Sequence, residues 1–446
     1  MKDKHGLLSA PLDNILMKMT VPMVFGMVAI LMFNLVDTFF ISMLGTQALA
    51  AVSFTFPVTF AVNCITMGIG AGISILVGRL LGRNEHREAA RVASHGLLLA
   101  LILVSLASLA GLTTITPLFG LLGAKTSLMP LISQYMEVWY LTIPLLVIPM
   151  AGNAAIRATG DTKTPAKIMM LAGGINGLLD PLLIFGPGPF PELGVRGAAI
   201  ASAISWAGAL LMSGYILVRR DKLLSFPSPA HISQDFKEIL SLGAPAAFSN
   251  ALNPLSGAVL MSMLASQGTA SVAAYGAAQR VESLLLIVMM SLCSVLTPLM
   301  AQNLGAGNRE RAFEALFKAM RFAFLFQLLV FAAMVPLSHP IAELFSQETL
   351  VREQLWLYLI VVPISYGLLG NVMLLSSALN ALKKTQYAFA VNLMRLFGLL
   401  LPLAWLGKYI NGTEGLFVGI AVAHAIAGFS AYLFARHLRS FPPQLN

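Results

Sequence analysis

The sequence predicts an all-α polytopic membrane protein with twelve transmembrane helices in two pseudo-symmetric six-helix bundles. Three observations predict this fold class: a very apolar composition, twelve apolar segments of membrane-spanning length, and a weak internal repeat of half the chain length. Because each half holds an even number of spans, the two bundles are expected to be parallel repeats, related by an axis along the membrane normal.

The composition excludes an ordinary soluble domain. Hydrophobic residues make up 57% of the chain and charged residues only 11%, and the mean hydropathy is +0.81. Soluble domains are about 25% charged, so this much apolar surface is expected to face lipid. The first apolar segment, residues 14–42, is too long for the apolar core of a cleavable signal peptide. We therefore expect it to be the first span.

Apolar segments of spanning length occur in the same order in both halves, and each reaches the roughly 20 residues that a spanning helix needs. Those of the first half are residues 14–42, 48–80, 91–113, 128–152, 164–186 and 196–218. Those of the second half are residues 236–264, 270–302, 315–337, 352–380, 385–407 and 415–437.

A shift of 223 residues aligns the two halves. The pairs that it aligns include Pro22 with Pro245, Leu81 with Leu304, Gly82 with Gly305, Ala155 with Ala378 and Thr162 with Thr385. Near the end the register slips by one residue and pairs Gly197 with Gly419. Two like bundles in one membrane chain are typical of secondary transporters, whose binding site lies where the repeats meet.

The basic residues set the predicted orientation. Most Lys and Arg lie near the termini and in the loops after even-numbered spans, whereas the odd-numbered loops hold only Lys125, Arg196, Arg352 and Lys408. By the positive-inside rule, both termini are expected to lie in the cytoplasm of a multi-pass inner (plasma) membrane protein. The predicted domains are an N-terminal bundle over 1–218, a cytoplasmic linker over 219–235 and a C-terminal bundle over 236–446.

Several other classes of function are not expected. The net charge of +9 comes from basic residues in short loops, so it reflects membrane topology rather than nucleic-acid binding. Neither Gly78–Arg83 nor Gly68–Gly72 has the Gly-Lys-Ser/Thr ending of a phosphate loop. Cys64 and Cys293 lie inside apolar segments without CxxC spacing, so no metal and no cofactor are expected.

Two acids inside the first bundle are the main candidate site. Asp37 lies in the first span and Asp180 in the fifth, at similar depth, and Asn34 and Asn176 precede them on the same helix faces. A carboxylate in hydrocarbon is costly unless it faces a cavity or has a function. Two neighbouring carboxylates cannot both ionise cheaply, so the pair could exchange protons; with the amide oxygens it could also bind Na⁺. A buried network that only fixes packing is the alternative.

The second bundle does not repeat this chemistry. At the shift of 223, Asp37 corresponds to Leu260, so an ion site is expected in the first bundle only. The second bundle instead has Arg280, Glu282 and Arg395 at depth. Arg280 and Glu282 do not share a helix face, so each is expected to have another partner. Either a structural pairing inside the bundle or a role in gating or substrate binding fits these positions.

Several motifs resemble those of a known transporter family. They are PMVFGMVAILMFNLVDT from Pro22 to Thr38, NAAIRATGDTKTP from Asn153 to Pro165, INGLLDPLLIFG from Ile175 to Gly186, and the following GVRGAAIAS. With the paired six-helix layout, they make the chain similar to the multidrug and toxic compound extrusion (MATE) transporters over essentially its whole length. The resemblance implies a V-shaped pair of bundles that alternates between inward-open and outward-open states.

The resemblance also implies roles for individual residues. The family's coupling acid and its fifth-span pair match Asp37, Asn176 and Asp180, and a supporting polar network matches Tyr135 and Asn153, to which we add Asn34. The acids that some branches place in the seventh and tenth spans are absent here, which resembles the DinF-type branch and its proton coupling. In that branch Pro22 corresponds to the hinge of the first span.

The predicted function is export of hydrophobic organic cations in exchange for protons, as in multidrug efflux and antibiotic resistance. The chain is expected to be a monomer in the lipid bilayer and not an enzyme, since no cluster of His, Asp or Ser marks a membrane face. Two alternatives remain: a Na⁺-coupled antiporter, and a flippase for lipid-linked precursors. Such a flippase is expected to have several Arg or Lys residues in its cavity, where the first bundle has acids and amides.

Overall fold

The structure is a computed structural model that describes residues 6–225 and 229–440. Within these ranges the regular elements are all helices, and no strand occurs. The chain ends, whose cytoplasmic location is predicted, and residues 226–228 of the predicted linker lie outside the described residues. The described residues therefore confirm an all-α fold, and apolar helices long enough to cross a membrane make up most of it.

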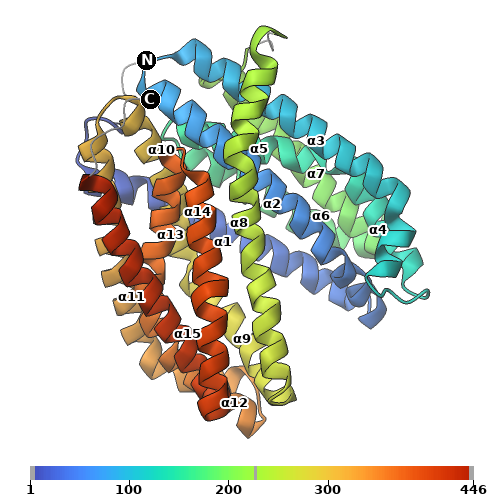
Figure 1. Cartoon of the computed structure of the whole chain (residues 1–446). Helices are drawn as coiled ribbons and strands as arrows, with labels where there is room; N and C mark the ends of the chain where they lie inside the picture. The colour runs from blue at the N-terminus through green and yellow to red at the C-terminus, as the bar shows by residue number, and fades with distance from the viewer. Residues whose placement is uncertain (1–5, 226–228, 441–446) are drawn as a thin grey trace. The chain divides into compact units, whose positions relative to one another are not determined.

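The first half of the chain forms seven α-helices, coloured blue to green in Figure 1. They are α1 (Leu12–Met43), α2 (Thr46–Gly82), α3 (His86–Leu121), α4 (Met129–Thr142), α5 (Pro144–Ala158), α6 (Lys163–Phe185) and α7 (Gly194–Tyr215). A short π-helical segment, η1 (Ile216–Arg220), continues α7.

The second half begins with the short 3₁₀ helix η2 (Pro229–His231) and ends with the longest helix. Its α-helices are α8 (Ile232–Ala265), α9 (Thr269–Leu285), α10 (Ile287–Gly305), α11 (Arg309–Phe345), α12 (Thr349–Val361), α13 (Tyr366–Ala381), α14 (Thr385–Leu393) and α15 (Leu401–Ser440). The 3₁₀ helix η3 (Pro363–Ser365) joins α12 to α13, and the π-helix η4 (Met394–Leu400) joins α14 to α15.

The twelve predicted segments all lie in helices, but several helices are broken or merged. The fourth segment bends by 46° between α4 and α5, where Pro144 cannot donate a backbone hydrogen bond. The eighth segment is divided into α9 and α10, and the tenth into α12 and α13 with η3 between them. The eleventh segment passes through α14 and η4 into α15, where it continues into the twelfth, and only the non-helical backbone of Asn411 and Gly412 separates the two. Composition predicted these segments but not their internal breaks.

Contacts divide the chain into two compact units, which we call unit 1 and unit 2. Unit 1 contains residues 18–247, and unit 2 contains residues 6–17 and 248–440 of the described chain. The first turns of α1 therefore belong to unit 2, and the first turns of α8 belong to unit 1. This division differs from the predicted bundle boundaries at 218 and 236, because the start of each half packs with the other half.

The end of the predicted linker is part of unit 1. Asp235, in the first turn of α8, is buried, and one of its carboxylate oxygens lies 3.0 Å from Arg91 Nε and 2.6 Å from His95 Nδ1. The backbone N–H of Ser225 donates to Ser94 Oγ at 2.9 Å. The connection between the halves is thus held against α3 at both of these points.

Glycine allows the last two helices of the repeat to pack closely in both units. A Cβ atom on Gly197 would lie 2.2 Å from the carbonyl oxygen of Leu183, and one on Gly419 would lie 2.3 Å from that of Leu403. No side chain fits at such distances. In unit 1 this contact holds α7 against α6, which brings Ser202 next to Asn176.

Candidate functional site

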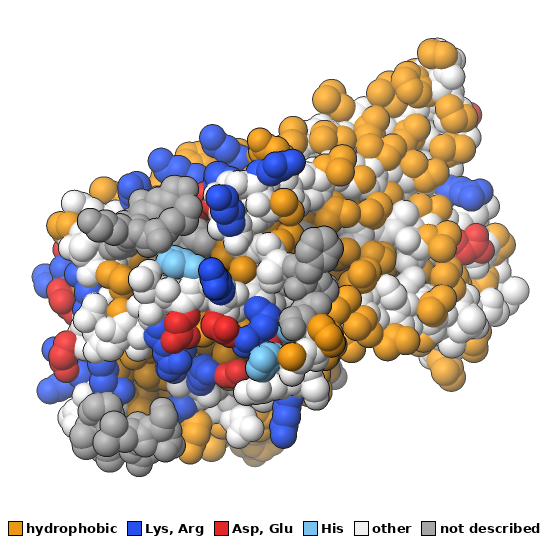
Figure 2. Space-filling model, turned by 90° about the horizontal axis from the view of Figure 1, so that it is seen from above, with side chains coloured by type: hydrophobic (Ala, Val, Ile, Leu, Met, Phe, Trp, Pro, Cys, Tyr) orange, Lys and Arg blue, Asp and Glu red, His pale blue; other side chains and the backbone are white. Residues whose placement is uncertain are grey.

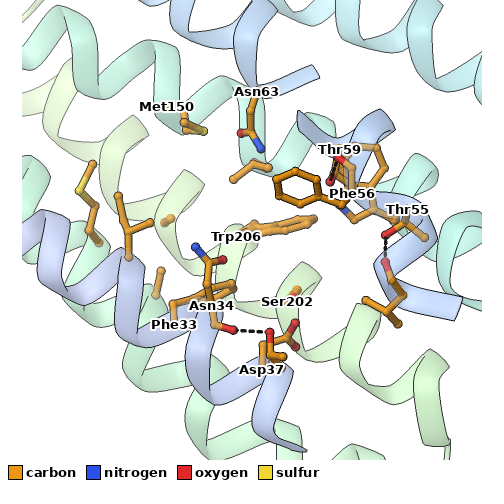
Figure 3. Close-up of a pocket in the computed structure, with 18 of the residues that line it drawn as sticks. Phe33, Asn34, Asp37, Thr55, Phe56, Thr59, Asn63, Met150, Ser202 and Trp206 are labelled. Atoms are coloured by element: carbon orange, nitrogen blue, oxygen red, sulfur yellow. Dashed lines mark hydrogen bonds between the residues drawn. The ribbon is translucent and has the colours of Figure 1, made fainter. Parts of the chain in front are cut away.

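A cavity of about 610 Å³ lies inside unit 1, and Figure 3 shows the side chains around it. Aromatic rings, amides and hydroxyl groups line it, together with one carboxyl group, that of Asp37. The aromatic side chains are Phe33, Phe56, Tyr135, Trp139 and Trp206, and the amides are Asn34, Asn63 and Asn153. Flat apolar surfaces with a few polar groups are typical of sites for organic molecules.

Asp37 is supplied by α1 and is partly buried in the cavity wall. Its Oδ1 atom is buried and has no hydrogen-bond partner among the described residues. In Figure 3 the carboxyl group lies near Ser202, whereas the Asn34 amide lies on the side of Trp206. Asn34 also accepts a hydrogen bond from Thr38 through its backbone carbonyl, at 2.7 Å. The two residues share a helix face, as expected, but reach different parts of the cavity.

Asn176 and Asp180 are supplied by α6 and are fully buried. Asn176 Nδ2 donates to Asp180 Oδ1 at 3.1 Å and to Ser202 Oγ on α7 at 3.3 Å. The helical spacing of four residues predicted the first contact, and the second depends on the packing of α7. Asn176 Oδ1 and Asp180 Oδ2 are buried without a partner among the described residues.

The carboxyl groups of Asp37 and Asp180 lie close enough to interact electrostatically with each other. Each also interacts electrostatically with the hydroxyl group of Tyr135 on α4. Asn153 of α5 is buried, lines the same cavity, and has a buried side-chain oxygen without a partner in the described chain. Helices α1, α4, α5 and α6 thus bring the candidate residues of the first bundle to one place. Their role in ion coupling stays a prediction.

Sequence reasoning did not single out three residues of this site: Ser202, Trp139 and Trp206. Ser202 lies at the end of the GVRGAAIAS motif, and Trp206 follows one helical turn later on the same face of α7. The sequence shows that spacing. It does not show which helices pack against this face of α7, because those helices are distant along the chain.

Pro22 lies inside α1, four residues after the point where the chain passes from unit 2 to unit 1. Without an N–H, Pro22 leaves the carbonyl of Lys18 without its helical donor. The carbonyl of the next residue, Met19, accepts a hydrogen bond from Thr162 Oγ1 at 2.9 Å. The position is suited to bending, and a hinge at Pro22 stays a prediction.

Glu282 of unit 2 is surrounded by hydrogen-bond donors. The hydroxyl groups of Tyr358 and Tyr366 both donate to Glu282 Oε2, the latter at 3.0 Å, and Arg395 is near enough to interact electrostatically. Arg280 is exposed on the same helix and lies apart from this group. Glu282 therefore has the structural pairing that was one of its two interpretations, while gating or substrate binding by Glu282 or Arg280 is untested.

No group of three or more His, Cys, Asp or Glu side chains within residues 6–225 and 229–440 is placed to hold a metal ion. The acids of unit 1 form a pair, and the other oxygens near them belong to amides, hydroxyl groups and a tyrosine. This chemistry suits proton exchange, or weak binding of a monovalent cation, better than a divalent metal site.

The sequence profile of the MatE family matches this chain twice, over residues 22–182 and 245–406. The double match confirms the internal repeat, since both stretches begin at equivalent prolines, Pro22 and Pro245. The chain therefore belongs to the MatE family of multidrug and toxic compound extrusion transporters. It is a multi-pass membrane transporter and not an enzyme.

Relatives and solved structures agree with this assignment along nearly the whole chain. A Shewanella oneidensis protein named FAD transporter is 46% identical over 98% of this chain and 97% of its own length. A probable multidrug resistance protein of Bacillus subtilis, YoeA, is 29% identical over 86% of this chain and 84% of its own. The crystal structure of a mutant of the Vibrio cholerae MATE transporter VcmN superposes with a TM-score of 0.92 at 34% identity, covering 96% of this chain and 98% of the other.

Proposed function

We propose that this transporter exports planar aromatic organic compounds through the cavity of unit 1, driven by protons that bind at Asp37 and Asp180. The observation that carries the proposal is a cavity lined by the indole rings of Trp139 and Trp206 that also contains a carboxyl group coupled to a second, buried one. Aromatic walls bind flat rings with little geometric restriction. The acid pair supplies a group whose charge can change during the cycle.

Protons are the favoured coupling ion because of the oxygens that lack donors. Asp37 Oδ1 and Asp180 Oδ2 are both buried without a partner in the described chain. An ionised carboxylate in such a place is costly, and a bound proton removes the charge. Sodium is the alternative ion, since the amide oxygens of Asn153 and Asn176 are also without partners. Transport measured in sodium-free medium distinguishes protons from Na⁺ as the coupling ion.

Hydrophobic organic cations are the first candidate substrates. An ionised acid at the cavity attracts a cation, and protonation of the acid releases it. Linkage requires the reverse effect as well: a bound cation lowers the affinity for protons by the same factor. Competition of this kind gives exchange of substrate for protons without a second site. Relatives named for multidrug resistance or export are consistent with this candidate.

Flavin adenine dinucleotide (FAD) is the second candidate, favoured by the 46% identity to a protein named FAD transporter. Its flavin and adenine rings suit the same aromatic walls. Its two phosphates are negatively charged, so bound FAD should raise the affinity of the acid pair for protons, where a bound cation lowers it. FAD should bind better when Asp37 and Asp180 are protonated, whereas an organic cation should bind better when they are ionised. Protons and FAD would then move in the same direction, so export in exchange for protons fits the organic cation and not FAD.

Binding measured against pH distinguishes the two substrates. Purified full-length protein is titrated with a fluorescent organic cation, and separately with FAD, whose flavin is itself fluorescent. Affinity for the cation should rise with pH, and affinity for FAD should fall. In everted vesicles without sodium, a pH gradient alone should drive transport of the true substrate. Transport that requires Na⁺ and ignores pH would overturn the proton assignment, and failure of both ligands to bind would overturn the substrate class.

A further inference from the structure

A second cavity, of about 630 Å³, lies inside unit 2 between α11, α13 and α15. Figure 1 shows these three helices side by side, and α13 packs against both of the others. We call this cavity the arginine groove. The residues that line it are Phe317, Met320, Arg321, Phe324, Asn371, Tyr432, Arg436 and Arg439. The proposed transport site of unit 1 uses none of them.

The groove is cationic, and part of its charge is not neutralised by the protein. Arg439 donates to Glu310 at 2.8 Å. Arg321 and Arg436 have no ion pair or hydrogen bond from their side chains to another residue in the described ranges. The residues that flank Arg321 on α11 are apolar, and an arginine in such a segment usually finds an anion or reaches the aqueous interface.

A buried amide faces the same space. Asn371 of α13 is only 6% exposed and lines the groove, yet its side-chain oxygen has no partner among the described residues. Rotation of the Asn371 amide by half a turn directs its N–H₂ group into the groove. A bound group with acceptor oxygens would satisfy the amide N–H₂ and the two free guanidinium groups together.

The walls of the groove are aromatic. The rings of Phe317 and Tyr432 meet edge to face, 5.9 Å apart, and the guanidinium of Arg439 lies 5.9 Å from the centre of the Phe317 ring. After Arg321, α11 continues toward its C-terminal end with exposed apolar side chains: Phe322 is 47% exposed, Leu325 53% and Leu329 67%. A charged pocket thus opens onto an apolar helix face.

The predicted topology places this groove at the inner surface of the membrane. Arg436 and Arg439 lie in the last turns of α15, next to the first turn of α11, where Arg309 donates to the carbonyl of Leu438 at 2.6 Å. The positive-inside rule assigns these helix ends to the cytoplasm. Figure 2 shows that Lys and Arg side chains gather in one area of the surface, whereas hydrophobic side chains cover a broad area elsewhere. Basic pockets between helices on the cytoplasmic side are suited to lipid headgroups.

We propose that the arginine groove binds the phosphate of an anionic phospholipid of the inner leaflet, with Arg321 and Arg436 as its charged ligands and Asn371 as a neutral donor. The chemistry is recognition of a phosphate group by guanidinium groups. A lipid is the source favoured over a soluble phosphate compound, because the exposed face of α11 offers a path for acyl chains directly below the pocket.

The test is native mass spectrometry of the full-length protein taken from bilayers of phosphatidylcholine mixed with an equal amount of phosphatidylglycerol. The wild-type protein should retain phosphatidylglycerol in preference to phosphatidylcholine. The double variant Arg321→Gln/Arg436→Gln should lose about tenfold or more of that preference, since each basic residue near the membrane surface strengthens the attraction for an anionic lipid. The matched control is Arg83→Gln/Arg87→Gln, which removes two exposed arginines of unit 1 on the same predicted side.

Two further measurements, on a lysine variant and with a soluble phosphate compound, complete the test. Arg321→Lys/Arg436→Lys keeps the positive charges but loses the paired hydrogen bonds of the guanidinium groups, so its preference should lie between those of the wild type and the Gln variant. Full retention of the wild-type preference would overturn recognition by guanidinium groups, and loss equal to that of the Gln variant would overturn a contribution from charge. Inorganic pyrophosphate, added in excess, should leave the lipid bound. Displacement of the lipid by pyrophosphate would assign the groove to a soluble phosphate compound instead. Equal lipid retention by the double variant and the matched control would overturn the proposal entirely.

Discussion

The two units share one fold but differ in the hydrogen bonds made to the carboxyl groups inside their helical bundles. In unit 1, Asp37 and Asp180 each keep a buried oxygen without a donor among the described residues, and one of them lines a cavity. In unit 2, Glu282 accepts hydrogen bonds from Tyr358 and Tyr366. A buried carboxyl oxygen without a donor makes ionisation costly, whereas hydrogen bonds from two tyrosines stabilise the ionised form of Glu282.

The repeat makes this difference easy to locate. At the shift of 223 residues, Asp37 and Asp180 of unit 1 correspond to Leu260 and Leu403 of unit 2, and Leu260 is only 3% exposed. Apolar side chains occupy the place of the acid pair and belong to the hydrophobic core of unit 2. The repeat preserved the positions of the helices, while the chemistry of the polar site differs between the units.

The largest effect is expected from Asp37→Asn, which leaves a neutral side chain of nearly the same shape and thus imitates a permanently protonated site. Coupled export should fall to background, and the protein should remain folded. Efflux from cells with equal amounts of wild type and variant measures this. The matched control is Glu137→Gln, an exposed acid in α4 that does not line the cavity. Wild-type efflux by Asp37→Asn would contradict a coupling role.

A smaller loss of export is expected from changes to the buried pair on α6, Asn176 and Asp180. Asp180→Asn removes the second titratable group, and Asn176→Ala removes the donor to both Asp180 and Ser202. Each should lower export by about tenfold, in line with the loss of a hydrogen bond to a charged group. Ser202→Ala, which removes a single hydroxyl group, should have a weaker effect. If Asp180→Asn exported normally while Asp37→Asn did not, the two acids would not share one site.

Glu282→Gln should affect stability more than coupling. The neutral amide loses the charge that faces Arg395 and weakens two hydrogen bonds from tyrosines. We expect a loss of about 1–3 kcal/mol in the free energy of unfolding. Thermal unfolding in detergent measures it, with the exposed Glu353→Gln of the same unit as control. Unchanged stability together with abolished export would instead assign Glu282 to gating or substrate binding.

The smallest effect concerns Asp161, in the loop between α5 and α6, and its dependence on pH. Burial alone would raise the pKa of Asp161, but hydrogen bonds from the side chain and backbone of Thr164 and the charge of Arg220, 2.7 Å away, outweigh burial and lower it. A lowered folded-state pKa stabilises the protein above the unfolded value of about 4, and this stabilisation is lost as the pH falls.

Asp161→Asn should therefore destabilise the protein by about 1 kcal/mol at neutral pH. Thermal unfolding of wild type and variant should converge as the pH is lowered below about 4. Lys384 occupies the equivalent position of unit 2 and is exposed, so Lys384→Gln is the matched control and should show no such convergence. A difference that stays constant over this pH range would mean that the charge of Asp161 does not stabilise the fold.

The sequence by itself determined the features that depend on local order along the chain. Apolar segments of spanning length predicted the helices, and the shift of 223 residues predicted the repeat. The spacing of four residues predicted that Asn176 and Asp180 would meet, because such residues lie one turn apart on any α-helix. Intramembrane charge identified Asp37 and Asp180 without any knowledge of packing, since charges in hydrocarbon are too costly to be incidental.

Only the tertiary structure decided the contacts between distant segments. The hydrogen bond from Asn176 to Ser202 depends on the close approach of α7 to α6 at Gly197. The division of α1 and α8 between the two units, and the partners of Glu282, depend on helices separated by many residues. Helical periodicity fixes which face of a helix a side chain occupies, but it does not fix which helix that face meets. That choice is made by packing over the whole unit.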